Sequence, residues 1–144
     1  MAADAVFLDT NLLVAASRPG ERRVPAELLL RRYGDRGSPM WISRQILREY
    51  LDVVTRPQAT LPPLAVLDAI ADVRRFADLF HLAADGPEVT AALLDLLARF
   101  PTGGKQVHDT NIVATMLVHG IGRLMTFNRA DFARIADVIT VEPD

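Results

Sequence analysis

Short apolar runs alternate with longer amphipathic stretches along this chain. The runs cover residues 5–8, 40–42, 81–83, 123–127 and 138–141. The amphipathic stretches cover residues 11–16, 26–33, 43–55, 64–76, 88–99, 109–118 and 130–135. Short apolar runs bounded by turn residues are typical of buried strands, and apolar positions three and four apart are typical of helices. Strands separated by helices predict an α/β fold with a mainly parallel sheet covered on both faces.

No repeat, low-complexity tract or linker divides the sequence, so we expect a single domain spanning residues 1–144. The formal net charge is −2, which gives no general attraction to nucleic acid. The chain has no cysteine, which excludes disulfides and thiolate metal sites. The apolar stretches are shorter than a membrane span and the first residues lack a secretory signal, so we expect a cytoplasmic protein without a membrane partner.

Asp9 directly follows the first apolar run, residues 5–8. A carboxylate at the carboxyl end of a parallel strand faces the crevice in which open α/β sheets bind ligands. Asp9 is therefore the first candidate site residue, and other polar residues must join it to make a site.

Two further acids lie on predicted helices. Glu49 is at the edge of the apolar stripe of the helix at 43–55, where a solvated surface position is the simpler interpretation. Asp109 projects into the stripe that includes Ile112 and Val113. An acid on that face either caps the helix start or binds a metal ion, and both interpretations stay open here.

Asn128 and Asp131 follow the predicted strand at 123–127. They can form a capping arrangement for the helix at 130–135, with Arg134 paired to Asp131. Asn128 nevertheless occupies a second strand end, where the sheet would open to a ligand.

Several carboxylates in one cleft would repel each other and raise each other's pKa. A divalent cation removes that conflict, and carboxylate oxygens suit Mg²⁺ or Mn²⁺. Such an ion can activate water for cleavage of a phosphodiester. The sequence offers neither a serine triad nor histidines at zinc-ligand spacing as an alternative.

Three segments resemble the PIN-domain family. They are Val6–Asn11, Ile42–Ser43 with Glu49 in the next helix, and His108–Ala114 leading to Leu124–Phe132. Their order and spacing fit the family over essentially the whole chain, which also resembles the toxins of VapBC-type toxin–antitoxin pairs. The resemblance implies a three-layer α/β/α sandwich and a Mg²⁺- or Mn²⁺-dependent endoribonuclease. It also implies an RNA substrate, a homodimer and a cognate antitoxin protein.

The resemblance assigns roles to the acids. Asp9 and Asp109 would hold the metal most directly, and Glu49 would hold a second ion or a metal-bound water. Asn128 aligns with a fourth catalytic position that is often aspartate in the family. Because the residue here is asparagine, it brings no charge to that position. Asp131, three residues further on, is the alternative fourth residue.

Other polar residues would support this site. By the resemblance, Thr10, Asn11 and Ser43 match positions that contribute hydroxyl or amide contacts. Ser43 is also placed to cap the helix at 43–55. Lys105 follows two glycines without the other residues of a Walker loop, and it is a candidate phosphate contact.

Two other functions compete with this interpretation. A phosphatase of the haloacid dehalogenase type also places an aspartate after its first strand. It needs a second, proton-donating acid two residues later, and this chain has Asn11 at that position, which cannot transfer the proton. Alternatively, the domain could bind RNA or protein without cleavage, with its acids serving as caps and surface charges.

Overall fold

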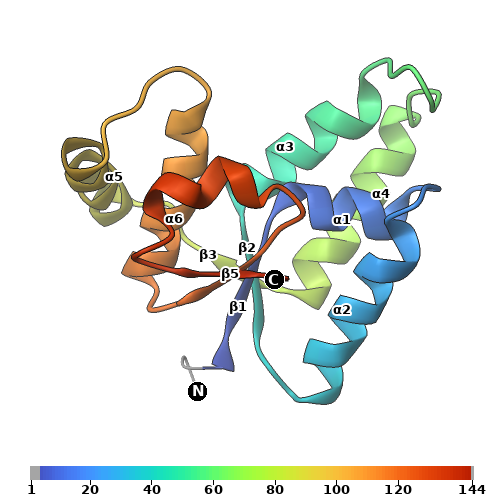
Figure 1. Ribbon diagram of the computed structural model, residues 1–144. Coiled ribbons are helices and arrows are strands. Elements are labelled where there is room, and N and C mark those ends of the chain that lie inside the picture. The colour runs from blue at the N-terminus through green and yellow to red at the C-terminus, as the bar shows by residue number, and fades with distance from the viewer. Residues whose placement is uncertain (1–3, 144) are drawn as a thin grey trace.

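Strands and helices alternate along the computed structural model, which describes residues 4–143 (Figure 1). The strands are β1 (Val6–Leu8), β2 (Met40–Ser43), β3 (His81–Ala83), β4 (Arg123–Met125) and β5 (Thr140–Glu142). The helices are α1 (Thr10–Ser17), α2 (Arg23–Asp35), α3 (Arg44–Thr55), α4 (Val66–Leu79), α5 (Pro87–Arg99), α6 (Gln106–Val118) and the 3-10 helix η2 (Arg129–Ile135).

The strands form one sheet in the order β3-β2-β1-β4-β5, with every neighbouring pair parallel. The central strand β1 is completely buried, and its Phe7 pairs with Trp41 of β2 and Leu124 of β4. The chain extends the sheet first toward β3 and later toward β5. The carboxyl ends of β1 and β4 therefore flank the point where the strand order reverses, which is where open α/β sheets bind ligands.

Helices cover both faces of the sheet. Helices α1 to α4 lie on one side, and α5 and α6 lie on the other (Figure 1). This arrangement confirms the predicted three-layer α/β/α sandwich with a parallel sheet. Within residues 4–143, every helix is too short or too polar to cross a bilayer.

Two element boundaries near the strand ends differ from the sequence expectation. Strand β4 ends at Met125, because the backbone N–H of Phe127 donates to the side chain of Asn11 at 3.0 Å and not to another strand. Helix α6 begins at Gln106, directly after a turn in which Gly104 has a φ of +64°. Glycine adopts this left-handed conformation without a steric cost, so the helix starts earlier than the apolar pattern indicates.

A buried aromatic contact fixes α3 against α4. Tyr50 of α3 is fully buried and packs edge-on against Phe76 of α4, with ring centroids 4.9 Å apart. Its hydroxyl donates to Oδ2 of Asp72 at 2.6 Å. The position of α3 matters for function because this helix also carries Glu49.

Replacing Tyr50 by phenylalanine would remove the link to Asp72 and keep the ring contact. We expect the free energy of unfolding to fall by about 1 kcal/mol, the typical net contribution of one hydrogen bond. Asp72 keeps its ion pair with Arg75 at 3.0 Å, so its charge is not left alone. Urea denaturation measures this loss, and a loss as large as that of a deleted core side chain would contradict the assignment.

Candidate active site

A cleft of about 1060 Å³ opens at the carboxyl ends of β1 and β4. Its walls come from α1 and the segment that joins α1 to α2, from α3 and the segment that follows it, and from the starts of α6 and η2. The sequence-predicted site residues that line it are Asp9, Thr10, Asn11, Glu49, Lys105, Asp109, Asn128 and Asp131. The fold thus brings together residues from distant parts of the chain, as the sequence analysis expected.

Asp9 lies at the base of this cleft. It caps the N-terminus of α1, and its side chain is only 7% exposed. Its Oδ1 accepts the backbone N–H of Thr10 at 2.8 Å, and its Oδ2 accepts the Thr126 hydroxyl at 2.8 Å and the Asn11 amide at 3.1 Å. These three donors hold the carboxylate in one orientation.

Thr126 is a residue that the sequence reasoning did not single out. It is fully buried one position after β4, and its hydroxyl also accepts from the Asn11 amide and from the backbone N–H of Asn128, both at 3.0 Å. The signal in the sequence that could have identified Thr126 is its hydroxyl side chain at a strand end, two residues before Asn128. The Asn11 amide donates to Asp9 and Thr126. A carboxamide does not ionise near neutral pH, so Asn11 cannot act as the proton donor that a phosphatase of the haloacid dehalogenase type needs.

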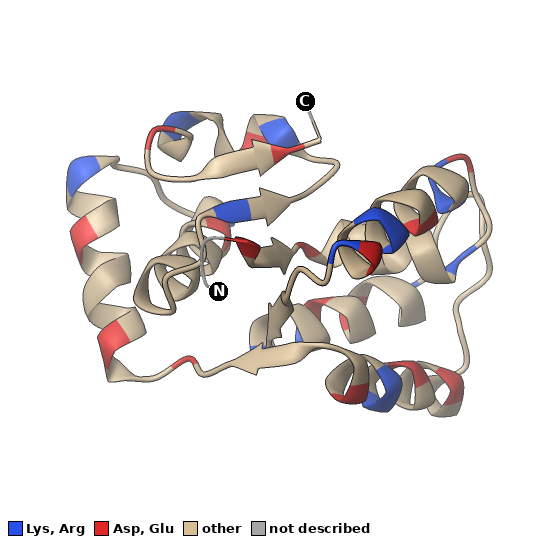
Figure 2. Ribbon diagram, turned by 90° about the horizontal axis from the view of Figure 1, so that it is seen from below, with Lys and Arg blue, Asp and Glu red and all other residues tan. Residues whose placement is uncertain are grey.

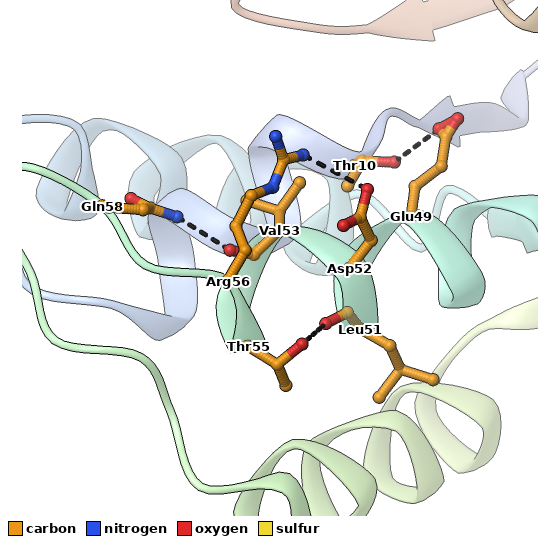
Figure 3. Close-up of polar contacts among 8 residues, drawn as sticks. All are labelled: Thr10, Glu49, Leu51, Asp52, Val53, Thr55, Arg56 and Gln58. Carbon is orange, nitrogen blue, oxygen red and sulfur yellow. Dashed lines mark hydrogen bonds and ion pairs between the residues drawn. The ribbon is translucent and has the colours of Figure 1, made fainter.

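Glu49 faces the cleft, so the simpler interpretation of a solvated helix surface was wrong. Its Oε2 accepts from the Thr10 hydroxyl at 3.3 Å, and its Oε1 accepts from the Gln45 amide at 3.2 Å. Figure 3 shows Thr10 pointing toward Glu49, with Asp52 further along α3 and Arg56 directly after the end of the helix.

Asp109 lies in the first turn of α6, four residues after the N-cap position at Lys105. It therefore does not cap the helix start, which removes one of its two interpretations. Its half-buried carboxylate faces the same cleft as Asp9.

The capping roles expected of Ser43 and Asn128 were wrong. Ser43 occupies the N-cap position of α3, but its buried hydroxyl has no hydrogen-bond partner in residues 4–143. It is 1% exposed and does not line the cleft. Asn128 occupies the N-cap position of η2, but its side chain makes no capping hydrogen bond. Its side chain and that of Asp131 are exposed at the cleft.

The expected pairing of Arg134 with Asp131 is replaced by contacts to α6. Arg134 donates to the Thr110 hydroxyl at 2.6 Å and to the carbonyl oxygen of Gln106 at 3.2 Å. The guanidinium thereby connects η2 to the first turn of α6. Arg134 is also close enough to Asp109 for its positive charge to lower the pKa of Asp109.

The electrostatics of the cleft disfavour ionised acids. Burial raises the pKa of Asp9 from 3.8 to about 6, although hydrogen bonds from Thr126 and Thr10 lower it. Burial also raises the pKa of Asp109 from 3.8 to about 7, and the charges of Asp9, Asp131 and Glu49 add to this increase. The effect of Arg134 on Asp109 is the smallest of these influences. The acids are therefore close enough to repel each other.

These acids fit a hydrated divalent cation. The three donors to Asp9 are neutral, so its charge is not compensated by them. Within residues 4–143, however, no three histidine or acidic side chains are already gathered as a metal-binding group. Mg²⁺ keeps several bound waters and needs only one or two carboxylates from the protein. Acids that share a cleft without surrounding an ion on all sides therefore suffice for such an ion.

Basic side chains line the same cleft. They are Arg18, Arg22, Arg23, Arg56 and Lys105. Arg22 lies over the ring of Phe127, 5.2 Å from its centroid, whereas Arg56 pairs with Asp52 at 3.3 Å. Lys or Arg and Asp or Glu residues occur in both helical layers (Figure 2), and residues of both signs line the cleft.

Comparison with known proteins identifies the family. The family model for the PIN domain matches residues 6–138, and the chain belongs to this family. No curated protein sequence matches the chain significantly.

Several solved structures share the fold. The sarcin-ricin loop cleaving toxin VapC20 of Mycobacterium tuberculosis is 18% identical with a TM-score of 0.70, covering 96% of this chain and 100% of that one. A DNA-bound VapBC complex of Salmonella typhimurium is 20% identical with a TM-score of 0.67, and 96% of each chain is covered. The promoter-bound VapBC2 complex of Rickettsia felis is 19% identical with a TM-score of 0.63, covering 96% and 97%.

The raised pKa values predict how the stability of the metal-free protein depends on pH. The folded state binds more protons than the unfolded state between pH 3.8, the usual pKa of aspartate, and the folded values of about 6 and about 7. The stability contributed by these groups is therefore complete below the unfolded pKa and is lost as pH rises through the folded values.

We expect the unfolding free energy of the metal-free protein to fall between about pH 4 and about pH 7, and Asp109→Asn to make that fall shallower. Urea denaturation with EDTA at several pH values measures both. Asp95→Asn is the matched control, because Asp95 is exposed on α5 and contacts Arg99 at 3.5 Å. An equal pH dependence in the Asp109 variant and the parent would contradict the assignment.

Proposed function

We propose that this protein is a Mg²⁺- or Mn²⁺-dependent endoribonuclease, the toxin of a type II toxin–antitoxin pair. The observation that carries the proposal is the sharing of one cleft by Asp9, Asp109 and Glu49 at the point where the strand order reverses. The likeness in fold to an RNA-cleaving toxin supports the same chemistry.

The acids supply the ligands that this chemistry needs. Asp9 and Asp109 would hold the ion, and Glu49 would hold a second ion or a bound water. When bound, Mg²⁺ or Mn²⁺ lowers the pKa of water and stabilises negative charge on the phosphate. Asn128 would orient the attacking water or the phosphate through its amide, with Asp131 nearby as an exposed acid.

The protein's own hydrogen bonds keep the acids in place. Thr126 and Asn11 prevent Asp9 from turning, and the Thr10 hydroxyl donates to Glu49 at 3.3 Å. Ser43 ends β2 outside the cleft lining, so any support from it would be indirect. A carboxylate held in one orientation loses less conformational freedom when it binds its ligand.

The cations around the acids would bind RNA phosphates. Arginine can contact phosphate through two parallel hydrogen bonds, and Lys105 supplies a point charge next to the start of α6. Lys105, Arg18 and Arg22 line the same cleft as the acids, so a phosphodiester backbone in the cleft would meet both the acids and cations.

The proposal extends to protein partners. Val24 and Leu28 of α2 and Leu67 of α4 are 62%, 57% and 80% exposed, on the same helical layer. Such residues suit a cognate antitoxin or a second copy of the chain. The VapBC neighbours were solved as toxin–antitoxin complexes, which supports an antitoxin here. A homodimer in the cytoplasm completes the proposal.

Asp9→Asn tests the catalytic assignment. We expect RNA cleavage with Mn²⁺ to fall by about 100-fold or more, because the variant loses a charged ligand at the reacting centre. The melting temperature of the metal-free protein should stay equal or rise, since removal of a buried charge offsets the loss of the acceptor Oδ2, to which Thr126 and Asn11 donate. Sequencing of fragment ends and thermal unfolding measure the two effects.

Asp95→Asn removes an equivalent charge outside the cleft and should keep full activity. Cleavage that survives in the Asp9 variant would refute its catalytic role, and metal-independent cleavage by the parent would refute the metal requirement. Specific RNA binding without any cleavage by the parent would favour the non-catalytic alternative.

Lys105→Ala tests the phosphate contact. We expect the KM for RNA to rise while kcat changes little, and the slope of log affinity against log salt to fall by about 1. Titration of labelled RNA at several salt concentrations measures the slope. Arg99→Ala removes one positive charge from α5, outside the cleft, and should leave the slope unchanged; equal effects of the two variants would contradict a specific contact.

A further inference from the structure

A buried glutamine joins the two helices that carry the acids. Gln45 is the second residue of α3 and is 6% exposed. Its Nε2 donates to Oε1 of Glu49 at 3.2 Å and to the carbonyl oxygen of His108 at 2.8 Å. Its Oε1 accepts from Nδ2 of Asn111 at 2.9 Å, and Asn111 also donates to Oδ2 of Asp85 at 3.2 Å.

The orientation of the Gln45 amide follows from its neighbours. The two groups at Nε2, the Glu49 carboxylate and the His108 carbonyl, are both acceptors. The group at Oε1 is the amide nitrogen of Asn111, which is a donor. A flipped amide would place oxygen against oxygen on one side and N–H against N–H on the other, so one orientation satisfies all contacts.

These contacts set the relation between two acids. Glu49 lies one helical turn after Gln45, and His108 immediately precedes Asp109 in α6. Because one amide binds the Glu49 carboxylate and the peptide before Asp109, it fixes both parts of the cleft relative to each other. Thr10 holds the second oxygen of Glu49 at 3.3 Å, which leaves this carboxylate little freedom to turn.

We propose that Gln45 is a positioning residue for divalent-metal binding in the acidic cleft, a role that rests on the proposed function. Gln45 does not line the cleft itself, so it acts through Glu49 and through the first turn of α6. Hydrogen-bond partners of metal-binding side chains typically contribute about 10- to 100-fold to metal affinity or activity. Gln45, held by Asn111, is such a hydrogen-bond partner of Glu49.

The test replaces both partners by apolar residues, in the double variant Gln45→Leu with Asn111→Leu. Removing both amides avoids leaving one of them buried and unpaired, so the fold should persist. We expect the Mn²⁺ concentration for half-maximal thermal stabilisation to rise about 10-fold or more. The Mn²⁺ requirement of RNA cleavage should rise in parallel, with the KM for RNA changed less than about twofold.

Thr55→Val is the matched control. Thr55 also lies on α3 and donates to the carbonyl oxygen of Leu51 at 2.5 Å, but it does not line the cleft. Its loss should leave the Mn²⁺ response unchanged. Gln45→Met, which keeps the chain length and loses the amide, replaces the double variant if the latter does not unfold cooperatively.

A folded variant with the Mn²⁺ response of the parent would overturn the positioning role. A parent that is stabilised by Mn²⁺ but does not cleave RNA would overturn the proposed function alone, because the stabilisation comparison still decides the role of Gln45. A parent that Mn²⁺ does not stabilise would overturn both.

Discussion

The buried carboxylate of Asp9 imposes the constraint around which the site is built. It ends the central strand of the sheet, where water is largely excluded, and burial disfavours its charged form. Thr126, Asn11 and the backbone of Thr10 supply hydrogen bonds that recover part of the lost solvation. Its position at the N-terminus of α1 adds the favourable end of the helix dipole. A bound cation would complete the neutralisation of this carboxylate.

The two helical layers meet at this carboxylate. Helix α3 covers one face of the sheet and brings Glu49 to the strand ends, while α6 covers the other face and brings Asp109 (Figure 1). Residues on opposite layers can share a cleft only at an edge of the sheet, where no strand separates them. The amide of Gln45 bridges the layers at that edge, and Arg134 ties η2 to the first turn of α6. The site therefore depends on how the layers are joined as much as on the acids themselves.

The charge pattern would allow this slightly acidic protein to bind the proposed anionic substrate. The formal net charge of −2 would give little attraction to RNA. The cleft, however, is lined both by acids at the strand ends and by cations such as Arg22 and Lys105. The acids suit a metal ion and the cations suit phosphates, so both could bind in one place without a strongly basic surface.

The amino-acid sequence by itself determined the alternation of strands and helices, because apolar periodicity is a local property of the chain. It also placed Asp9 at a strand end and Asp109 on an inward helix face, since both positions follow from the residues next to them. The environment of Glu49 depended on Thr10, which is 39 positions away, and Thr126 reaches Asp9 across 117 positions. Helical neighbours could not reveal these contacts. The tertiary structure alone decided which hydroxyls and amides surround each acid, left Ser43 without its expected cap bond and gave Arg134 partners on α6. Hydrogen bonding and desolvation depend on groups that folding brings close in space, and sequence distance does not report that proximity.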